Sequence, residues 1–203
     1  DIKKEGYNVS HELFMSLEGH NHYTMTKSLS VFLASFTDTL VRVKPTWVVL
    51  AGDRGEQLMG AVAAAYTYTP VAHIQAGELS GNIDGVARHA IGKFAHLHFA
   101  ANDDAAGRLR KLGEEDFRIH MVGHPALDPF VSGKVATQDQ LAQKYRIDTS
   151  KPYILVVLHP VTEDAEDVQD QAKSVIDALK DFPQPKVGVL SNNDAGSALL
   201  RQK

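Results

Sequence analysis

The sequence predicts an α/β protein with an open parallel sheet built from βαβ units. Short apolar runs alternate along the chain with stretches of helical periodicity, which is the pattern of such units. Polar clusters directly follow the apolar runs 47–50 and 71–74. The carboxyl ends of parallel strands are where an open sheet forms its ligand crevice, so these clusters are the candidate site.

The expected elements of the first part begin with an amphipathic helix over residues 23–43. Its apolar residues recur at helical spacing, and Pro45 ends it. The run 47–50 is short and wholly apolar, which fits a strand buried on both faces. The pattern then continues as helix 55–68, strand 71–74, helix 84–96, strand 97–101, helix 103–112 and strand 118–122.

A second part of the chain repeats this pattern after a segment of linker composition, 148–152. A helix over 137–145 precedes the linker, and strand 153–158, helix 164–180 and strand 186–190 follow it. We therefore expect a first domain over 1–149 and a second over 150–203. Some fifty residues bury little core on their own, so we expect more chain to belong to the second domain.

Composition excludes several classes of protein. The 203 residues are 43% hydrophobic and 23% charged, with a net charge of −4, which argues against nucleic acid as a partner. No apolar run approaches the roughly 20 residues of a membrane span. Cysteine does not occur, and the histidines show no ligand spacing with acids, so we expect no disulfide and no metal. We expect a cytoplasmic protein.

The ends of the sequence suggest a piece of a longer protein. The chain starts at Asp1 without a methionine and stops inside a helix-like run, 198–203.

Asp53 and Arg54 stand where the strand 47–50 ends. They could be a helix N-cap and a surface ion pair, or a carboxylate and a guanidinium held at the crevice. Gly52 before them would allow a ligand to approach the backbone closely.

The segment 73–89 concentrates polar side chains in a loop that leads into a helix. A histidine in a strand, such as His73, is more often structural than catalytic, and a loop glutamate such as Glu78 is usually solvated. Asp84 precedes an apolar-periodic helix and is expected to cap it. Asp84 and Arg88 are four residues apart, so they could pair. The joint occurrence of these side chains with His89 in one short segment still favours a binding or catalytic site.

Two further clusters lie in the second part of the chain. His159 ends the strand 153–158 and is held extended by Pro160. Asn193 and Ser197 follow the strand 186–190 and open a helix, where they can act as caps or help to bind a phosphate or sugar.

Taken together, these motifs resemble the hydrolysing UDP-N-acetylglucosamine 2-epimerases, the NeuC-like family that includes the epimerase half of the bifunctional epimerase/kinase. The resemblance rests on Gly52-Asp53-Arg54, on the HIxxGExSGxID and RHAIxKxAHxHF patterns, on the Gly123-His124-Pro125 turn, and on the HPVT and NxDAGS motifs. It implies Rossmann-like domains in a glycosyltransferase-B arrangement, of which this chain holds a first domain without its opening βαβ unit and the start of a second. It also implies elimination of UDP to a glycal, followed by addition of water.

The resemblance also assigns residues. Asp53, Asp84 and His159 match catalytic positions, and Gln75 stands where the superfamily commonly has a third acid, a role that Glu78 could take. Arg54 and Arg88 match positions that face the nucleotide or acidic partners, and His89, Asn193 and Ser197 belong to the same binding motifs. It implies a UDP-sugar substrate, no cofactor, and a homo-oligomer, a dimer or a tetramer.

Several alternatives stay open. A non-hydrolysing epimerase and a glycosyltransferase share the implied fold. A catalytically inactive UDP-sugar-binding protein is favoured by Gln75, since an amide cannot exchange protons at neutral pH. The sugar could be N-acetylglucosamine or a 2,4-diacetamido-6-deoxy analogue.

Overall fold

The computed structural model describes residues 2–17, 21–164, 167–191 and 197, and the chain divides into two compact units. The first unit comprises Asp1–Glu18 and Tyr23–His124, and the second comprises Gly19–His22 and Pro125–Lys203. The boundary between the units lies between His124 and Pro125, earlier in the chain than the expected domain boundary at 149–150. Two short helices separate it from the linker-like segment 148–152.

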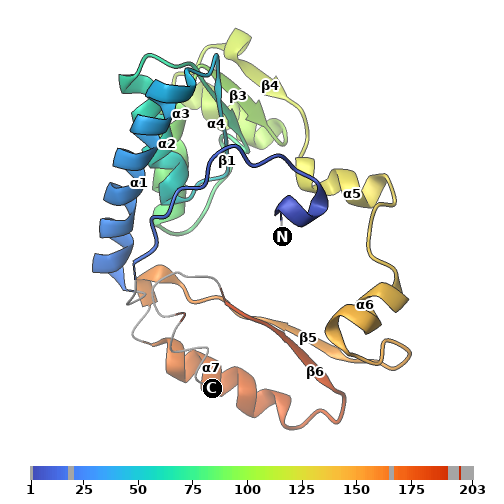
Figure 1. The fold of residues 1–203 in the computed structure, drawn as a ribbon. Coiled ribbons are helices and arrows are strands. Elements are labelled where there is room, and N and C mark those ends of the chain that lie inside the picture. The colour runs from blue at the N-terminus through green and yellow to red at the C-terminus, as the bar shows by residue number, and fades with distance from the viewer. Residues whose placement is uncertain (1, 18–20, 165–166, 192–196, 198–203) are drawn as a thin grey trace. The chain divides into compact units, whose positions relative to one another are not determined.

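The first unit is a four-stranded parallel sheet with helices between successive strands (Figure 1). The strands lie in sequence order, β1-β2-β3-β4. The elements are α1 (His22–Val43), β1 (Val48–Ala51), α2 (Gly55–Tyr66), β2 (Val71–Ile74), α3 (Ile83–Phe94), β3 (Leu97–Ala100), α4 (Asp103–Lys111) and β4 (Ile119–Met121), with 3-10 turns at Ile2–Glu5 and Asp116–Arg118.

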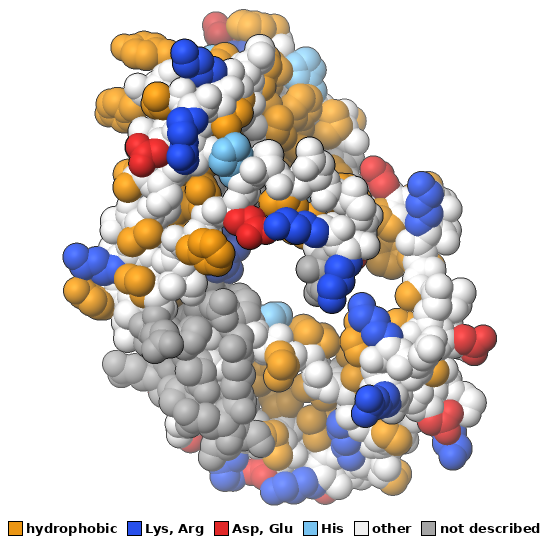
Figure 2. Space-filling view, in the orientation of Figure 1, with side chains coloured by type: hydrophobic (Ala, Val, Ile, Leu, Met, Phe, Trp, Pro, Cys, Tyr) orange, Lys and Arg blue, Asp and Glu red, His pale blue; other side chains and the backbone are white. Residues whose placement is uncertain are grey.

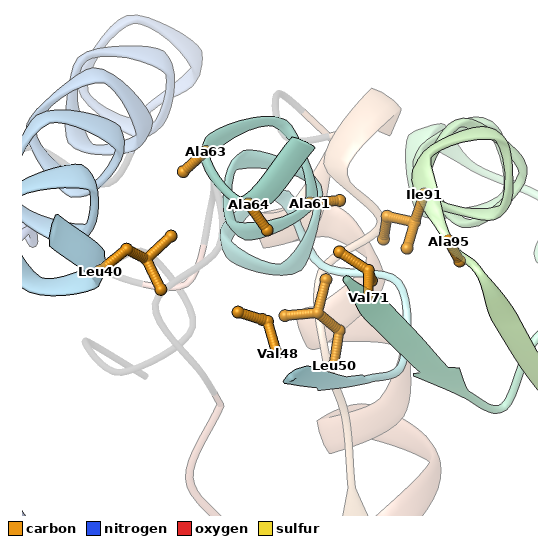
Figure 3. Packing of buried hydrophobic residues seen from close by; sticks show 9 residues of the cluster. All are labelled: Leu40, Val48, Leu50, Ala61, Ala63, Ala64, Val71, Ile91 and Ala95. Atoms are coloured by element: carbon orange, nitrogen blue, oxygen red, sulfur yellow. The ribbon is translucent and has the colours of Figure 1, made fainter. Parts of the chain in front are cut away.

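The helices cover one face of this sheet. Right-handed crossovers between strands in sequence order place α2, α3 and α4 on the same side, and Figure 1 shows α1, α2 and α3 next to one another. Residues of β1, β2, α1, α2 and α3 pack together there in a buried apolar cluster (Figure 3). Its members are Leu40, Val48, Leu50, Ala61, Ala63, Ala64, Val71, Ile91 and Ala95.

The expectation that β1 is buried on both faces is wrong. Val48 and Leu50 point toward the helices and are buried, but Val49, between them, is 61% exposed. Successive side chains of a strand point to opposite faces, and the helices that cover β1 lie on one of them. A wholly apolar strand sequence therefore does not establish that both faces of the strand are buried.

The second unit contains a two-stranded parallel sheet, β5 (Ile154–Val157) with β6 (Lys186–Val189). The helices α5 (Asp128–Val131) and α6 (Gln138–Tyr145) precede it, and α7 (Val168–Leu179) connects its strands. Thr137 and Gln140 begin α6 with a reciprocal capping box. Short 3-10 turns occupy Pro125–Leu127 and Thr162–Asp164. Both units thus have the predicted α/β character.

Exposed apolar side chains are interspersed with charged and polar ones on the face that Figure 2 shows. Within the described ranges, no helix has both the length and the apolar character to cross a membrane.

Candidate functional site

The turn that leaves β1 presents Asp53 at the carboxyl edge of the sheet. Gly52 adopts a φ of +88°, which few other residues tolerate, and so reverses the chain directly after the strand. Asp53 Oδ2 accepts hydrogen bonds from the Ser80 hydroxyl, at 2.9 Å, and from the Arg88 guanidinium. Both contacts use one carboxylate oxygen, and Oδ1 makes none with the described residues.

Arg88 connects three segments of the first unit. Its side chain is 7% exposed and pairs with Asp53 after β1 and with Glu78 Oε2, at 3.4 Å, in the loop after β2. Arg88 Nη1 also donates to the backbone carbonyl of Gln75 over 2.7 Å. A buried guanidinium needs such partners, because an unpaired buried charge is strongly unfavourable. One cation between two carboxylates leaves this cluster with a net negative charge.

The loop after β2 keeps its path because of unusual backbone angles. Gln75 has a φ of +62° and Gly77 one of +79°. A Cβ at Gly77 would lie 2.3 Å from the carbonyl oxygen of Ala105, so α4 packs directly on this part of the loop. Arg108 of α4 donates to the Gly77 carbonyl over 2.6 Å. These contacts fix the direction in which Gln75 and Glu78 leave the strand.

Asn82, and not Asp84, caps α3, so the expected capping role of Asp84 is wrong. Asn82 has the extended backbone of an N-cap, and its Oδ1 accepts from the Asp84 N–H over 3.1 Å. Asp84 is the second residue of the helix, and its Oδ2 accepts from Asn82 Nδ2 over 3.3 Å. The expected pair between Asp84 and Arg88 is likewise replaced, since Arg88 pairs with Asp53 and Glu78.

His73 contacts the backbone of the turn that follows β1. It is fully buried in β2, and its Nε2 lies 2.7 Å from the Gly52 carbonyl oxygen, to which it donates. Burial lowers the pKa of His73 to about 4, so the ring is neutral at physiological pH. Its buried Nδ1 has no hydrogen-bond partner in the described part of the chain. This favours the structural interpretation of His73.

Gln75 contacts a residue of the Gly123-His124-Pro125 turn. Its Nε2 lies 2.5 Å from His124 Nε2, and both side chains are half-buried. Sequence reasoning did not select His124 or Ser80 as site residues, although both lie inside quoted motifs. Their contacts join segments that are far apart in sequence, and periodicity carries no information about such contacts.

The other candidate residues are more dispersed. Arg54 immediately precedes α2 and pairs with Glu56 at 3.5 Å on the exposed surface. His89 lies on α3, and burial, together with the charges of Arg108 and Arg88, lowers its pKa. His159 follows β5 in the second unit and is exposed, whereas Ser197 is buried and its carbonyl accepts from Ser191 Oγ at 3.4 Å. Asn193 lies outside the described residues.

Among the residues that the structure describes, no three His, Asp or Glu side chains are grouped as metal ligands would be. The geometry instead offers carboxylates, an imidazole and amide groups at a sheet edge, which are groups suited to binding and proton transfer on a polar organic ligand.

Known proteins resemble this chain along its whole length. The family model described as UDP-N-acetylglucosamine 2-epimerase matches residues 1–203. A protein of Legionella pneumophila named UDP-N,N'-diacetylbacillosamine 2-epimerase (hydrolyzing) is 34% identical over 202 residues, which cover 100% of this chain and 54% of that protein. A UDP-N-acetylglucosamine 2-epimerase of Neisseria meningitidis is 30% identical over 203 residues, 100% of this chain and 53% of that protein. The chain thus spans about half the length of these relatives.

Solved structures give the same result for the fold. The UDP-GlcNAc 2-epimerase of Methanocaldococcus jannaschii, in complex with UDP-GlcNAc and UDP, superimposes with a TM-score of 0.80 at 17% identity, over 99% of this chain and 56% of that one. This likeness confirms the predicted fold class, Rossmann-like parallel sheets of the glycosyltransferase-B kind that are partly present here. The sequence, its relatives and the fold agree, and the chain belongs to the UDP-N-acetylglucosamine 2-epimerase family.

Proposed function

We propose that the full-length protein containing this chain is a hydrolysing 2-epimerase of a UDP-2-acetamido sugar, which releases UDP and the free 2-epimeric sugar. From UDP-N-acetylglucosamine, the product is N-acetylmannosamine. The observation that carries the proposal is the fixed Asp53 carboxylate, held through one oxygen by Ser80 and Arg88 at the carboxyl edge of the sheet. The relative at 34% identity, whose name specifies the hydrolysing reaction, supports it.

The proposed reaction has two steps, an elimination and an addition of water. A base takes the proton from C2, the C2–H electron pair forms the C1–C2 double bond, and the C1–O bond breaks with its pair leaving on the diphosphate of UDP. Water then adds to the double bond, with its oxygen at C1 and a proton at C2 on the opposite face. Both steps need positioned acid–base groups, each contributing about 10²–10⁴-fold in rate.

We assign these roles to Asp53, Asp84 and Glu78 in the first unit and to His159 in the second. Asp53 keeps an oxygen free of contacts with the described residues, which suits it to proton exchange. Gln75 is an amide and positions rather than transfers protons. The proposed substrate-binding residues are Arg54, Arg88, His89, Asn193 and Ser197. Arg88 also pairs with the carboxylates of Asp53 and Glu78, and so it would position these two acids as well as contribute to binding.

Incubation of the full-length protein with a UDP-sugar tests this function. UDP-N-acetylglucosamine and the UDP-2,4-diacetamido-6-deoxy sugar are supplied separately, and free UDP and reducing sugar are measured. We expect UDP and free 2-epimer to appear in equal amounts with one of the two. The diacetamido sugar is tested because two hydrolysing relatives carry it in their names.

Two other outcomes would each replace the proposal. A UDP-linked 2-epimer without free UDP would identify a non-hydrolysing epimerase of the same fold. Binding of UDP without turnover of either sugar would identify a binding protein, the alternative that Gln75 at a common acid position favours.

A further inference from the structure

Ser80 joins the loop between β2 and α3 to the Asp53 carboxylate. Its hydroxyl donates to Asp53 Oδ2 over 2.9 Å and accepts from Arg88 Nη2 over 3.4 Å. A guanidinium only donates and a carboxylate only accepts, so the Ser80 hydroxyl is oriented by its two neighbours. Its proton is therefore directed at the Asp53 oxygen.

The backbone of Ser80 lies directly on the first turn of α3. A Cβ built on Gly85, the third residue of that helix, would collide with the carbonyl oxygen of Ser80. Gly85 is buried, and the absence of a side chain there allows the loop to approach the helix this closely. The neighbours Leu79 and Gly81 are exposed, whereas Ser80 is half-buried. Ser80 is thus the residue through which this part of the loop is fixed.

Ser80 and Arg88 hold Asp53 in different ways. Arg88 serves three acceptors, because it also pairs with Glu78 and donates to the Gln75 carbonyl. The Ser80 hydroxyl has Asp53 as its acceptor. A carboxylate held by one donor can pivot about that contact, and a second donor from another segment removes the freedom to pivot. The two donors together aim the second oxygen of Asp53, Oδ1, in one direction.

We propose that Ser80 is a positioning residue that fixes the orientation of the Asp53 carboxylate for proton transfer at the sugar. The inference rests on the proposed function, in which Asp53 is an acid–base group. Ser80 exchanges no proton with the substrate in this role. A misplacement of a reacting group by about 1 Å can cost about 10²-fold in rate. Loss of the Ser80 hydroxyl should therefore lower kcat more than it affects substrate binding.

Ser80→Thr and Ser80→Val form a matched pair of variants. Threonine and valine have nearly the same shape, and only threonine keeps the hydroxyl. UDP release by the full-length protein is measured with the UDP-sugar that the wild type turns over. We expect Ser80→Val to lower kcat by about 10–100-fold with KM changed by less than about 3-fold, and Ser80→Thr to stay within about 3-fold of the wild type in both constants. Ser30→Ala is the control, since the Ser30 hydroxyl donates to the Lys27 carbonyl on the exposed surface of α1.

A second measurement connects Ser80 to Asp53. When Asp53 is replaced by asparagine, the proposed proton-transfer group is missing and its orientation no longer matters. Ser80→Val should then lower the residual UDP release by less than about 3-fold, because the two residues act as one unit. A merely structural role of Ser80 in the loop would lower UDP release equally in both backgrounds.

The inference and the proposed function fail in different ways. Equal kcat values for Ser80→Thr and Ser80→Val, a loss confined to KM, or the same loss in the Asp53→Asn background would overturn the inference while the wild type remains an active hydrolysing epimerase. A wild type that releases no UDP from either sugar overturns the proposed function and the inference with it.

Discussion

Arg88 Nη1 and the backbone carbonyl oxygen of Gln75 lie 2.7 Å apart, so a side chain of α3 holds the backbone of the loop that leaves β2. The same guanidinium pairs with Asp53 from the turn after β1. A single buried cation therefore fixes the relative positions of two loops that carry the candidate acids.

Replacing Arg88 by methionine should destabilise the protein by about 2–3 kcal/mol, because it leaves two partly buried carboxylates without their counter-charge. Urea unfolding, followed by circular dichroism, measures the loss. Arg110→Met is the matched control, since Arg110 pairs with Asp116 on the surface, where such a pair contributes less than about 1 kcal/mol. Equal unfolding midpoints for the two variants would show that Arg88 is not needed for stability.

Asp53→Asn should lower UDP release by about 10²-fold or more, the scale of losing an acid–base group. Asparagine can still accept from Ser80 through its carbonyl oxygen, so the turn should keep its shape. Steady-state UDP release by the full-length variant is the measurement, and UDP binding checks the fold. Turnover within a few-fold of the wild type would remove Asp53 from the mechanism.

Asp84 and Asn82 should separate function from helix capping. Asn82→Ala removes the cap of α3 and should cost about 1 kcal/mol, whereas Asp84→Asn should cost less than about 0.5 kcal/mol. Turnover should show the opposite order, with Asp84→Asn the more damaging change. Stability and UDP release are measured on both variants. A fully active Asp84→Asn protein would leave Asp84 with a structural role only.

Gly77→Ala should destabilise the protein by more than about 3 kcal/mol. Its φ is +79°, and the new Cβ would meet the Ala105 carbonyl oxygen at 2.3 Å. Gly81, in the same loop, provides the control, because a Cβ there meets nothing within 4 Å. Gly81→Ala should change the free energy of unfolding by less than about 1 kcal/mol. Thermal unfolding of the two variants decides, and similar melting temperatures would contradict the close packing of α4 on this loop.

Stability should fall as the pH is lowered from about 6.5 to 4. The pKa of His73 is about 4 in the folded protein, against the ordinary value of 6.5 for a histidine, so the unfolded chain binds more protons in this window. The stabilisation is fully present above the unfolded pKa, and its loss on acidification amounts to about 3 kcal/mol. Burial also lowers the pKa of His98, which adds in the same direction.

The test of this pH dependence is His73→Gln, which keeps a donor for the Gly52 carbonyl but does not titrate. Urea unfolding at several pH values should give a shallower dependence for the variant than for the wild type. Identical slopes would mean that other groups account for the acid sensitivity.

Periodicity predicted the elements because each depends on local sequence. Every expected strand has a counterpart among β1–β6, and strand 71–74 is reproduced residue for residue. Errors arose where neighbours decide. Asn82 takes the capping role expected of Asp84, two residues later, since either side chain can cap and tertiary position selects one.

The sequence predicted which strand ends carry the polar side chains of the candidate site, but not the contacts between those side chains. Strand ends located Asp53, and the joint occurrence of polar residues pointed to Glu78 and Arg88. The sequence could not predict which acids pair with Arg88. Asp84 lies four residues before it on the same helix and is a possible partner, and nothing in the spacing shows that Asp53 and Glu78, from other segments, pair with it instead. The Gln75–His124 contact depends on the order of three strands, which helical or strand periodicity does not encode.

The position of Arg88 also constrains how this site can change. One guanidinium serves Asp53, Gln75 and Glu78, so substitutions at these positions share a partner and their energetic effects will not add. A variant selected for another sugar through changes in the 75–82 loop would alter the setting of Asp53 at the same time. In the proposed epimerase, specificity and catalysis would therefore be coupled through Arg88, and substitutions in this loop should be tested in pairs.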